Sequence, residues 1–173
     1  MKFSEVTTAD EIYAYLLSLP DNKVRRALST MWDEIILSDE ESFRLFQLLF
    51  ADPRYFTSQG MSGLLFHFLY GKYTKEQREF VTTTLFRHIE DINADFGLSM
   101  GRFLVEEYTY QEALDLMHQL VNQNTPNALD VAYWGIKGLI EKCQSDAYYE
   151  DNLPVLHKFY QRVVSCRAKI QSI

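Results

Sequence analysis

The feature that most constrains this chain is a helix-start signature that recurs at nearly even spacing. Each copy has a Ser or Thr followed three residues later by Glu or Gln: Thr8-x-x-Glu11, Ser38-x-x-Glu41, Thr74-x-x-Gln77 and Thr109-x-x-Glu112. In such a capping box the hydroxyl accepts from the backbone N–H of the third residue, and the Glu or Gln accepts from the N–H of the first. The pattern therefore predicts four helix N-termini.

The spacing of these signatures predicts a repeated unit. Successive copies are 30, 36 and 35 residues apart, and Ser145-Asp146, which we interpret as a plain N-cap, lies 36 residues further on. Two of the starts also share a Tyr-Thr dipeptide, Tyr73-Thr74 and Tyr108-Thr109. A period of about 35 residues is typical of stacked helix pairs, which usually present surfaces to partner proteins.

Apolar residues at three-and-four spacing predict about nine helices. We expect them over 9–18, 21–37, 39–51, 62–70, 75–91, 96–104, 110–121, 126–142 and from 154 onward, with a single turn in the connector 53–59. The 62–70 helix is apolar all round, so we expect it to be the buried centre, with Phe66 and Leu69 in the core. The predicted fold is all-α, with stacked antiparallel hairpins of a HEAT-like or irregular bundle in a single domain over 1–173.

The composition is typical of a globular protein, with 47 % hydrophobic and 24 % charged residues. The start lacks the basic and then apolar regions of a signal peptide, and the most apolar window, 63–70, is far shorter than the ~20 residues of a membrane span. Cys143 and Cys166 have no metal-like spacing to another Cys or His, so we expect reduced thiols. These features predict a cytoplasmic protein with no membrane contact.

Charge is spread unevenly along the chain. Residues 1–151 hold all 24 Asp and Glu with 13 of the 17 Lys and Arg, a net charge of −11, while 152–173 carry +4. Binding of DNA or RNA needs Lys and Arg that neutralise phosphates on one face, and an acidic body argues against it. A basic protein partner is more consistent with this charge.

A search for catalytic and metal-binding motifs gives no strong candidate. The chain has no zinc-protease, phosphate-loop or nucleophile-elbow motif. His88, Asp91 and Asp95 would share one helix face and suit a divalent ion, but a solvated polar face produces the same spacing. His67 is interpreted as a core imidazole, and His118 and His157 as helix-surface residues. We therefore expect no catalytic residue, no metal and no cofactor.

Tyrosines next to acidic groups form the candidate partner-binding surface. An aromatic ring offers contact area and a carboxylate offers charge to Lys and Arg of a partner. The alternative is that these loop tyrosines anchor one hairpin on the next. The candidate residues are Asp39, Glu40, Glu41, Glu106, Glu107, Tyr108, Tyr110, Tyr149, Glu150 and Asp151.

In overall character the chain resembles the small acidic helical immunity proteins with which bacteria neutralise toxins, many of them basic nucleases. The resemblance rests on length, on the Tyr-Thr hairpin starts and on the acidic groups Asp33-Glu34, Asp39-Glu40-Glu41, Glu90-Asp91 and Glu106-Glu107. It implies a non-enzymatic protein that binds and neutralises a basic toxin. A helical-repeat scaffold or regulatory adaptor is the alternative. A helical enzyme or ligand-binding domain, with a pocket under the 62–70 helix, would need polar groups in addition to His67.

Overall fold

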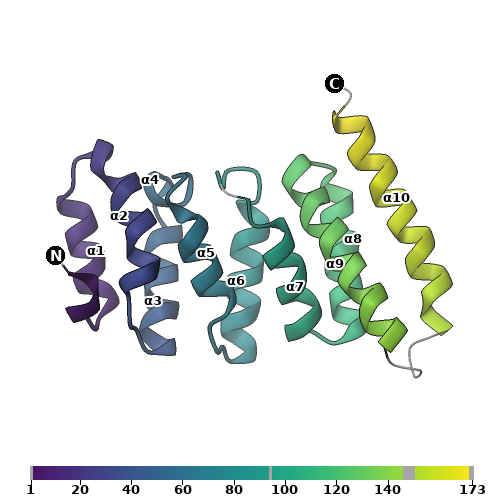
Figure 1. Cartoon of the computed structure of the whole chain (residues 1–173), viewed down its shortest axis with the longest axis horizontal. Coiled ribbons are helices and arrows are strands. Elements are labelled where there is room, and N and C mark those ends of the chain that lie inside the picture. The colour runs from purple at the N-terminus through teal and green to yellow at the C-terminus, as the bar shows by residue number, and fades with distance from the viewer. Residues whose placement is uncertain (1, 94, 146–150, 172–173) are drawn as a thin grey trace. The chain divides into compact units, whose positions relative to one another are not determined.

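A computed structural model of the chain describes residues 2–93, 95–145 and 151–171. Every regular element in these ranges is helical, with ten α-helices, short 3-10 turns and no strand (Figure 1). The all-α prediction is confirmed, and the tenth helix, α4, is the single turn expected between 53 and 59. The bounds are η1 Phe3–Glu5, α1 Ala9–Ser18, α2 Asp21–Glu34, α3 Asp39–Phe50, α4 Pro53–Phe56, α5 Met61–Leu69, α6 Lys75–Arg87, α7 Gly97–Glu107, α8 Tyr110–Gln123, α9 Pro126–Ser145 and α10 Leu153–Gln171.

All four predicted capping hydroxyls begin helices. The side chains of Thr8, Ser38, Thr74 and Thr109 accept from the N–H groups of Glu11, Glu41, Gln77 and Glu112, respectively. The reciprocal bond of a full capping box is present at Thr74 and Thr109. Glu11 instead accepts from the Thr8 hydroxyl, and Glu41 accepts from the Ala9 N–H of α1 at 2.6 Å. Glu41 therefore links the starts of two helices.

Three predicted boundaries are wrong. Helix α2 ends at Glu34, because Ile35 takes an extended conformation and buries its side chain. Helix α6 ends at Arg87, and the His88 ring after it packs on Phe56 with centroids 4.5 Å apart. Ser145 is not an N-cap, because α9 continues to it and its hydroxyl donates to the Lys142 carbonyl; Asp146 lies outside the described residues.

The chain divides into two compact units, residues 1–95 and 96–173, which we call the N-terminal and C-terminal units. Each is described by itself, and the single domain over 1–173 stays a prediction. In the N-terminal unit, α1 packs on α3 and α2 packs on α5, while α3 also contacts α4, α5 and α6. Among its fully buried side chains are Leu28, Phe46, Tyr55, Leu64 and Phe68.

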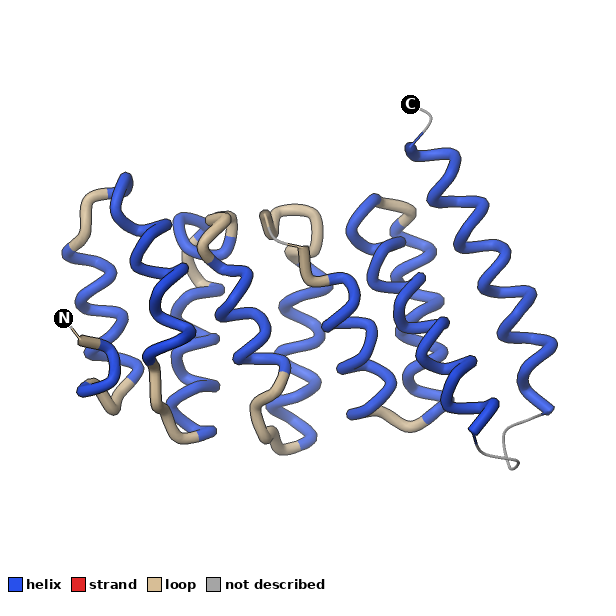
Figure 2. The backbone as a smooth tube through the Cα atoms, in the orientation of Figure 1, coloured by secondary structure: helices blue, strands red, loops and turns tan. Residues whose placement is uncertain are grey.

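Helix α9 is the centre of the C-terminal unit, where it packs against α7, α8 and α10. A Cβ added at Gly101 of α7 would lie 2.6 Å from the backbone nitrogen of Gly135 in α9, so these two backbones are in close approach. Arg167 of α10 donates to the Asp130 carboxylate of α9 at 2.7 Å. Loops and turns join successive helices in the described ranges (Figure 2).

The prediction that the 62–70 helix is buried on all sides is wrong. Helix α5 buries one face, formed by Met61, Leu64, Leu65, Phe68 and Leu69. Its other face reaches the surface, where Phe66 is 40 % exposed and the following Tyr70 is 66 % exposed. The strongest contacts of α5 are with α2 and α3, and they cover its buried face. Leu69 is therefore a core residue, and Phe66 is not.

Two further observations concern the membrane and the thiols. Among the described residues, no helix combines the length and the apolarity that crossing a membrane requires. Cys143 is buried, Cys166 is half-buried, and both are free thiols, in agreement with the prediction.

Candidate functional site

The first predicted acidic group, at the start of α3, is partly used to hold the fold. The Asp39 carboxylate accepts from the Lys72 N–H at 3.3 Å, and Glu41 caps α1 as described above. Glu40 is exposed and pairs with no cation among the described residues. Of this group, Glu40 is the one acid whose side chain is wholly available to a partner.

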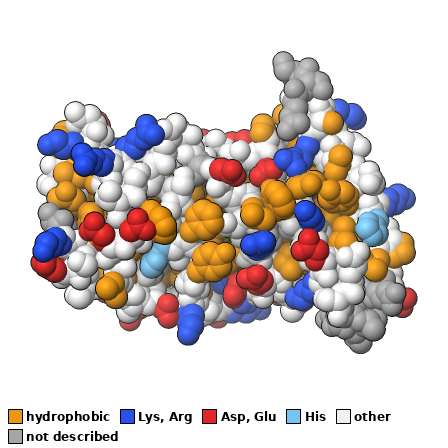
Figure 3. Space-filling view, viewed as in Figure 1, with side chains coloured by type: hydrophobic (Ala, Val, Ile, Leu, Met, Phe, Trp, Pro, Cys, Tyr) orange, Lys and Arg blue, Asp and Glu red, His pale blue; other side chains and the backbone are white. Residues whose placement is uncertain are grey.

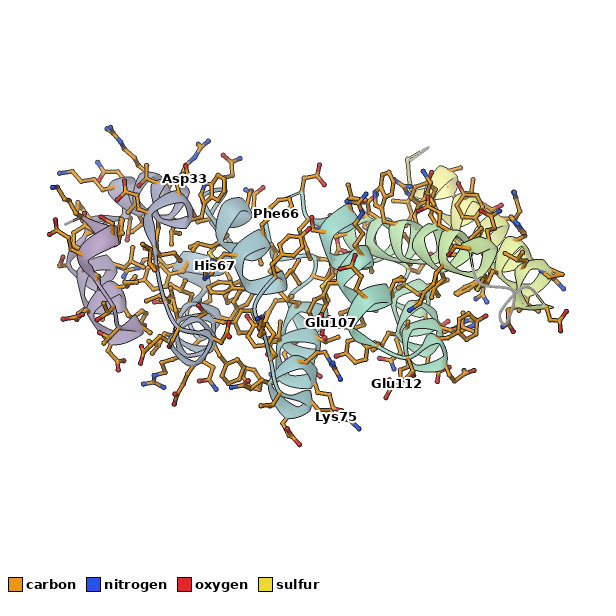
Figure 4. The ribbon with its side chains drawn as sticks, turned by 60° about the horizontal axis from the view of Figure 1, so that its bottom comes forward. Asp33, Phe66, His67, Lys75, Glu107 and Glu112 are labelled. Atoms are coloured by element: carbon orange, nitrogen blue, oxygen red, sulfur yellow. The ribbon has the colours of Figure 1, made fainter. Side chains whose placement is uncertain are left out.

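The second predicted group, at the end of α7, combines exposed acids with half-buried tyrosines. Glu106 and Glu107 are exposed, and Glu107 is labelled in Figure 4. Tyr108 packs edge-on against Phe103 with centroids 6.3 Å apart. Burial raises the pKa of Tyr110, and the Cys143 thiol nearby adds to the rise. Tyr108 therefore packs on its own helix and Tyr110 lies near α9, while the Glu106 side chain is exposed. The alternative, that these tyrosines anchor one hairpin on the next, stays a prediction.

Of the third predicted group, Tyr149 and Glu150 lie outside the described residues. Asp151 is described and exposed. The predicted groups at 39–41 and at 106–110 belong to different units, so each is a separate candidate surface. The set of partner-binding residues stays a prediction.

The structure does not bring His88, Asp91 and Asp95 together as one helix face. Helix α6 ends before them; His88 and Asp91 approach with Nδ1 and Oδ2 3.5 Å apart. Within the described ranges, no group of three His, Cys, Asp or Glu side chains is arranged to hold a metal ion. His118 stacks on Phe159 at 4.0 Å between centroids, and His157 is exposed.

A groove of about 650 Å³ lies on the exposed side of α2 and α5. The sequence suggested a pocket at the 62–70 helix only as an alternative, under the helix, and did not predict the contribution of α2. We call the observed groove the α2–α5 groove. Trp32, at 46 % exposure, Phe66 and Tyr70 give it aromatic walls. Figure 4 shows Phe66 and His67 on α5 and Asp33 on α2, and Figure 3 shows hydrophobic side chains exposed beside acidic ones. Its lining residues are Trp32, Ser62, Gly63, Phe66, His67 and Tyr70.

Gly63 fixes the position of the Trp32 ring. A Cβ added at Gly63 would overlap the Cγ, Cδ1 and Nε1 atoms of the Trp32 indole. The absence of that Cβ lets the indole lie directly against the backbone of α5. One face of the ring is therefore packed, while nearly half of the Trp32 side chain remains exposed to solvent.

His67 contributes the imidazole of the groove lining. Its Nε2 and the Ser42 Oγ of α3 are 3.1 Å apart and form a hydrogen bond. Burial lowers the pKa of His67, opposed by the negative charge of Asp39. A Ser–His pair resembles a nucleophile with its base, but Ser42 is 3 % exposed, so a substrate in the groove does not reach its hydroxyl.

The groove follows α5 from its first turn to Tyr70 and includes Trp32 in the last turn of α2, and these two helices are parallel. Gly60 at the start of α5 lies against Arg25 and Leu28 of α2, and Gly63 lies against Trp32. Contacts advance along both helices in the same direction, so α2 and α5 run parallel. Trp32 is in the last turn of α2, and Tyr70 is the C-cap of α5. The negative end of the α2 dipole is therefore close to Trp32, and that of the α5 dipole is close to Tyr70, while Ser62 and Gly63 of the lining belong to the first turn of α5.

Acidic residues strengthen this negative potential. Asp33 and Glu34 close α2, and no Lys or Arg lies in its last turn. Glu34 accepts from the Phe3 N–H at 3.4 Å, whereas Asp33 is exposed with no cation partner among the described residues. An acid at a helix C-terminus is unfavourable for the helix itself, and such a local conflict often marks a functional position.

Comparison of the chain with protein-family models, with curated proteins and with solved structures found no significant match. The groove, the exposed acids and the charge of the chain are therefore the features that bear on function.

Proposed function

We propose that this protein is a non-enzymatic, cytoplasmic protein that binds a basic partner protein. In its more specific form it is an immunity or inhibitor protein that binds and neutralises a basic toxin, of which a nuclease is one candidate. The proposal includes no cofactor, no direct contact with nucleic acid and no membrane.

One observation carries the proposal: three acids from separate segments are exposed and have no cation partner among the described residues. They are Asp33 at the end of α2, Glu40 at the start of α3 and Glu106 at the end of α7. The net charge of −7 has the same sign. Acids held in this way offer a basic partner electrostatic attraction without first breaking an internal ion pair.

A helical scaffold or regulatory adaptor remains the second candidate, because it would use the same exposed acids. The two differ in the partner and in what binding does to it. Loss of the partner's activity on binding supports the inhibitor, whereas unchanged activity supports the adaptor. An enzyme is less favoured because the Ser42 hydroxyl beside His67 is buried.

Affinity purification from the source cells with the wild-type chain and with Glu40→Lys/Glu106→Lys tests the proposal. We expect a basic protein on the wild-type chain and its loss on the variant. Association of the purified pair should slow as salt shortens the screening length from ~30 Å at 0.01 M to ~8 Å at 0.15 M. Glu41→Lys is not a clean test, because Glu41 caps α1.

A partner that both chains retain equally, with an association rate insensitive to salt, would contradict the proposal. Circular dichroism of the variant serves as the folding control. Because Glu40 and Glu106 are exposed, we expect the helix content to be unchanged.

A further inference from the structure

We infer that the α2–α5 groove binds an Arg or Lys side chain, flanked by apolar residues, from the basic partner protein. The inference rests on the proposed function and deepens it, since it names a surface and the chemistry by which the partner is held. None of the residues that line the groove belongs to the predicted acidic groups at 39–41 and 106–110.

The aromatic walls supply the first argument. Trp32, Phe66 and Tyr70 are 46 %, 40 % and 66 % exposed and line one groove. Isolated exposed apolar residues are ordinary, but three large aromatic side chains around one hollow are typical of an interaction site. The faces of Trp and Tyr rings attract the ammonium of Lys and, more often, the guanidinium of Arg.

Charge selects the cation over a neutral occupant. The negative end of α2, at Trp32, is equivalent to roughly half an elementary charge, and Asp33 adds a full charge next to Trp32 in the sequence. None of the lining residues is Lys or Arg, and burial lowers the pKa of His67, which disfavours a positive charge on its ring. No side chain of the lining therefore places a full positive charge against a guanidinium or ammonium.

The groove is also preformed. The Trp32 indole rests on the α5 backbone at Gly63, and the His67 ring is held by Ser42. Side chains that are already ordered lose little conformational entropy when a partner binds. An aromatic site fixed in this way binds more tightly than the same residues on a mobile loop.

Two other occupants are less consistent with these observations. A second copy of the chain would bring another acidic molecule of charge −7 against Asp33, which is unfavourable. An apolar small molecule would gain from the aromatic rings but nothing from the negative potential. Both occupants are outcomes of the experiment below.

Nuclear magnetic resonance titration of the full chain tests the inference. The probes are two acetylated and amidated pentapeptides, Ala-Leu-Arg-Leu-Ala and the same peptide with neutral citrulline in place of Arg. We expect the Trp32 indole resonance to shift saturably at millimolar concentrations of the Arg peptide. The citrulline peptide should bind with an affinity at least about 3-fold lower. The indole of Trp134, in the C-terminal unit, is the internal reference and should not move.

Variants locate the peptide. Phe66→Ala should weaken Arg-peptide binding several-fold, and Asp33→Asn should weaken it and reduce its salt dependence. Phe80→Ala is the matched control, because Phe80 is 44 % exposed in the same unit but does not line the groove. It should leave the affinity unchanged.

Equal affinity for the Arg and citrulline peptides, or for a Leu-only peptide, would overturn the inference in favour of an apolar ligand. A Trp32 shift that depends on protein concentration alone would overturn it in favour of self-association. No saturable shift with any peptide would overturn it as well.

The inference and the proposed function fail in different ways. If a basic partner binds the wild-type and Phe66→Ala chains equally, the proposed function is supported and the binding role of the groove is rejected. If the Arg peptide binds selectively but no basic protein partner is found, the binding role of the groove is supported and the proposed function is rejected.

Discussion

The helix pair α2–α5 in the N-terminal unit and the helix pair α7–α9 in the C-terminal unit each have a glycine at their contact, but the two glycines admit different groups. At Gly101 of α7, the space of the missing side chain is occupied by the backbone of Trp134 and Gly135 in α9. At Gly63 of α5, it is occupied by the Trp32 indole, which stays half-exposed.

The two glycines therefore have different consequences: one allows two helices to pack closely, and the other holds a side chain at the surface. Helix α9 is packed against α7, α8 and α10, so close approach at Gly101 closes a core. Helix α5 packs closely on α2 and α3, and close approach at Gly63 holds an aromatic ring at the surface instead. The same residue type thus stabilises one unit and shapes a candidate binding surface in the other.

The largest expected effect separates the two faces of α5. Leu69→Ala should lower the free energy of unfolding by ~3 kcal/mol, because Leu69 is 5 % exposed and its truncation leaves a cavity. Phe66→Ala should lower it by ~1 kcal/mol or less, because much of that ring is in water and no closed cavity forms. Urea unfolding measures both, and equal losses would show that Phe66 is as buried as Leu69 and that α5 has no exposed face.

The next effect tests the α7–α9 contact. Gly101→Ala should destabilise the protein by ~2 kcal/mol, because the new Cβ would lie 2.6 Å from the Gly135 nitrogen and a helix backbone yields little. Gly138→Ala is the matched control on α9, where the nearest atom is a Val105 methyl carbon at 3.4 Å. Gly138→Ala should raise the free energy of unfolding by ~0.5 kcal/mol, because Ala gives the unfolded chain less conformational freedom than Gly does. Similar losses at both positions would refute the close contact.

A smaller effect is expected at Gly63. Gly63→Ala should leave the free energy of unfolding within ~1 kcal/mol of wild type, because the gain in helix propensity offsets the displacement of a half-exposed ring. The Trp32 indole resonance should shift while that of Trp134 stays in place. A loss as large as that of Gly101→Ala would mean that Trp32 belongs to the core and does not present a surface.

Local rules account for what the sequence predicted well. A capping hydroxyl and its N–H are three residues apart, so Thr8, Ser38, Thr74 and Thr109 identify helix starts without knowledge of the fold. Most helix bounds follow from the same caps and from apolar periodicity. The helix end predicted near Leu37 failed because burial of Ile35, a tertiary effect, redirects the chain.

The candidate site depends on contacts that no local pattern contains. Glu41 satisfies the capping pattern at Ser38, yet its carboxylate bonds Ala9, 32 residues away. The groove requires Trp32 to meet Gly63 across two helices. Two signals were available: a glycine inside the very apolar 62–70 segment, and an acid directly after a Trp at a helix end. The number of apolar residues in that segment instead indicated a buried helix.

The smallest expected effect is the pH dependence of the free energy of unfolding that His67 of the groove lining causes. Because burial lowers the pKa of His67 in the folded chain, the unfolded chain binds more protons below pH ~6.5, its ordinary pKa. The contribution of neutral His67 is therefore complete above that pH and is lost as pH falls through the folded-state pKa. Urea unfolding at neutral and mildly acidic pH should show a free energy of unfolding that declines as the pH falls, and His67→Gln should reduce this decline.

Asp39→Asn should make the same decline steeper. The substitution removes the charge that raises the pKa of His67, while the side-chain oxygen at position 39 still accepts from the Lys72 N–H. A pH dependence unchanged by both substitutions would mean that the His67 ring is solvated and does not form part of a fixed groove.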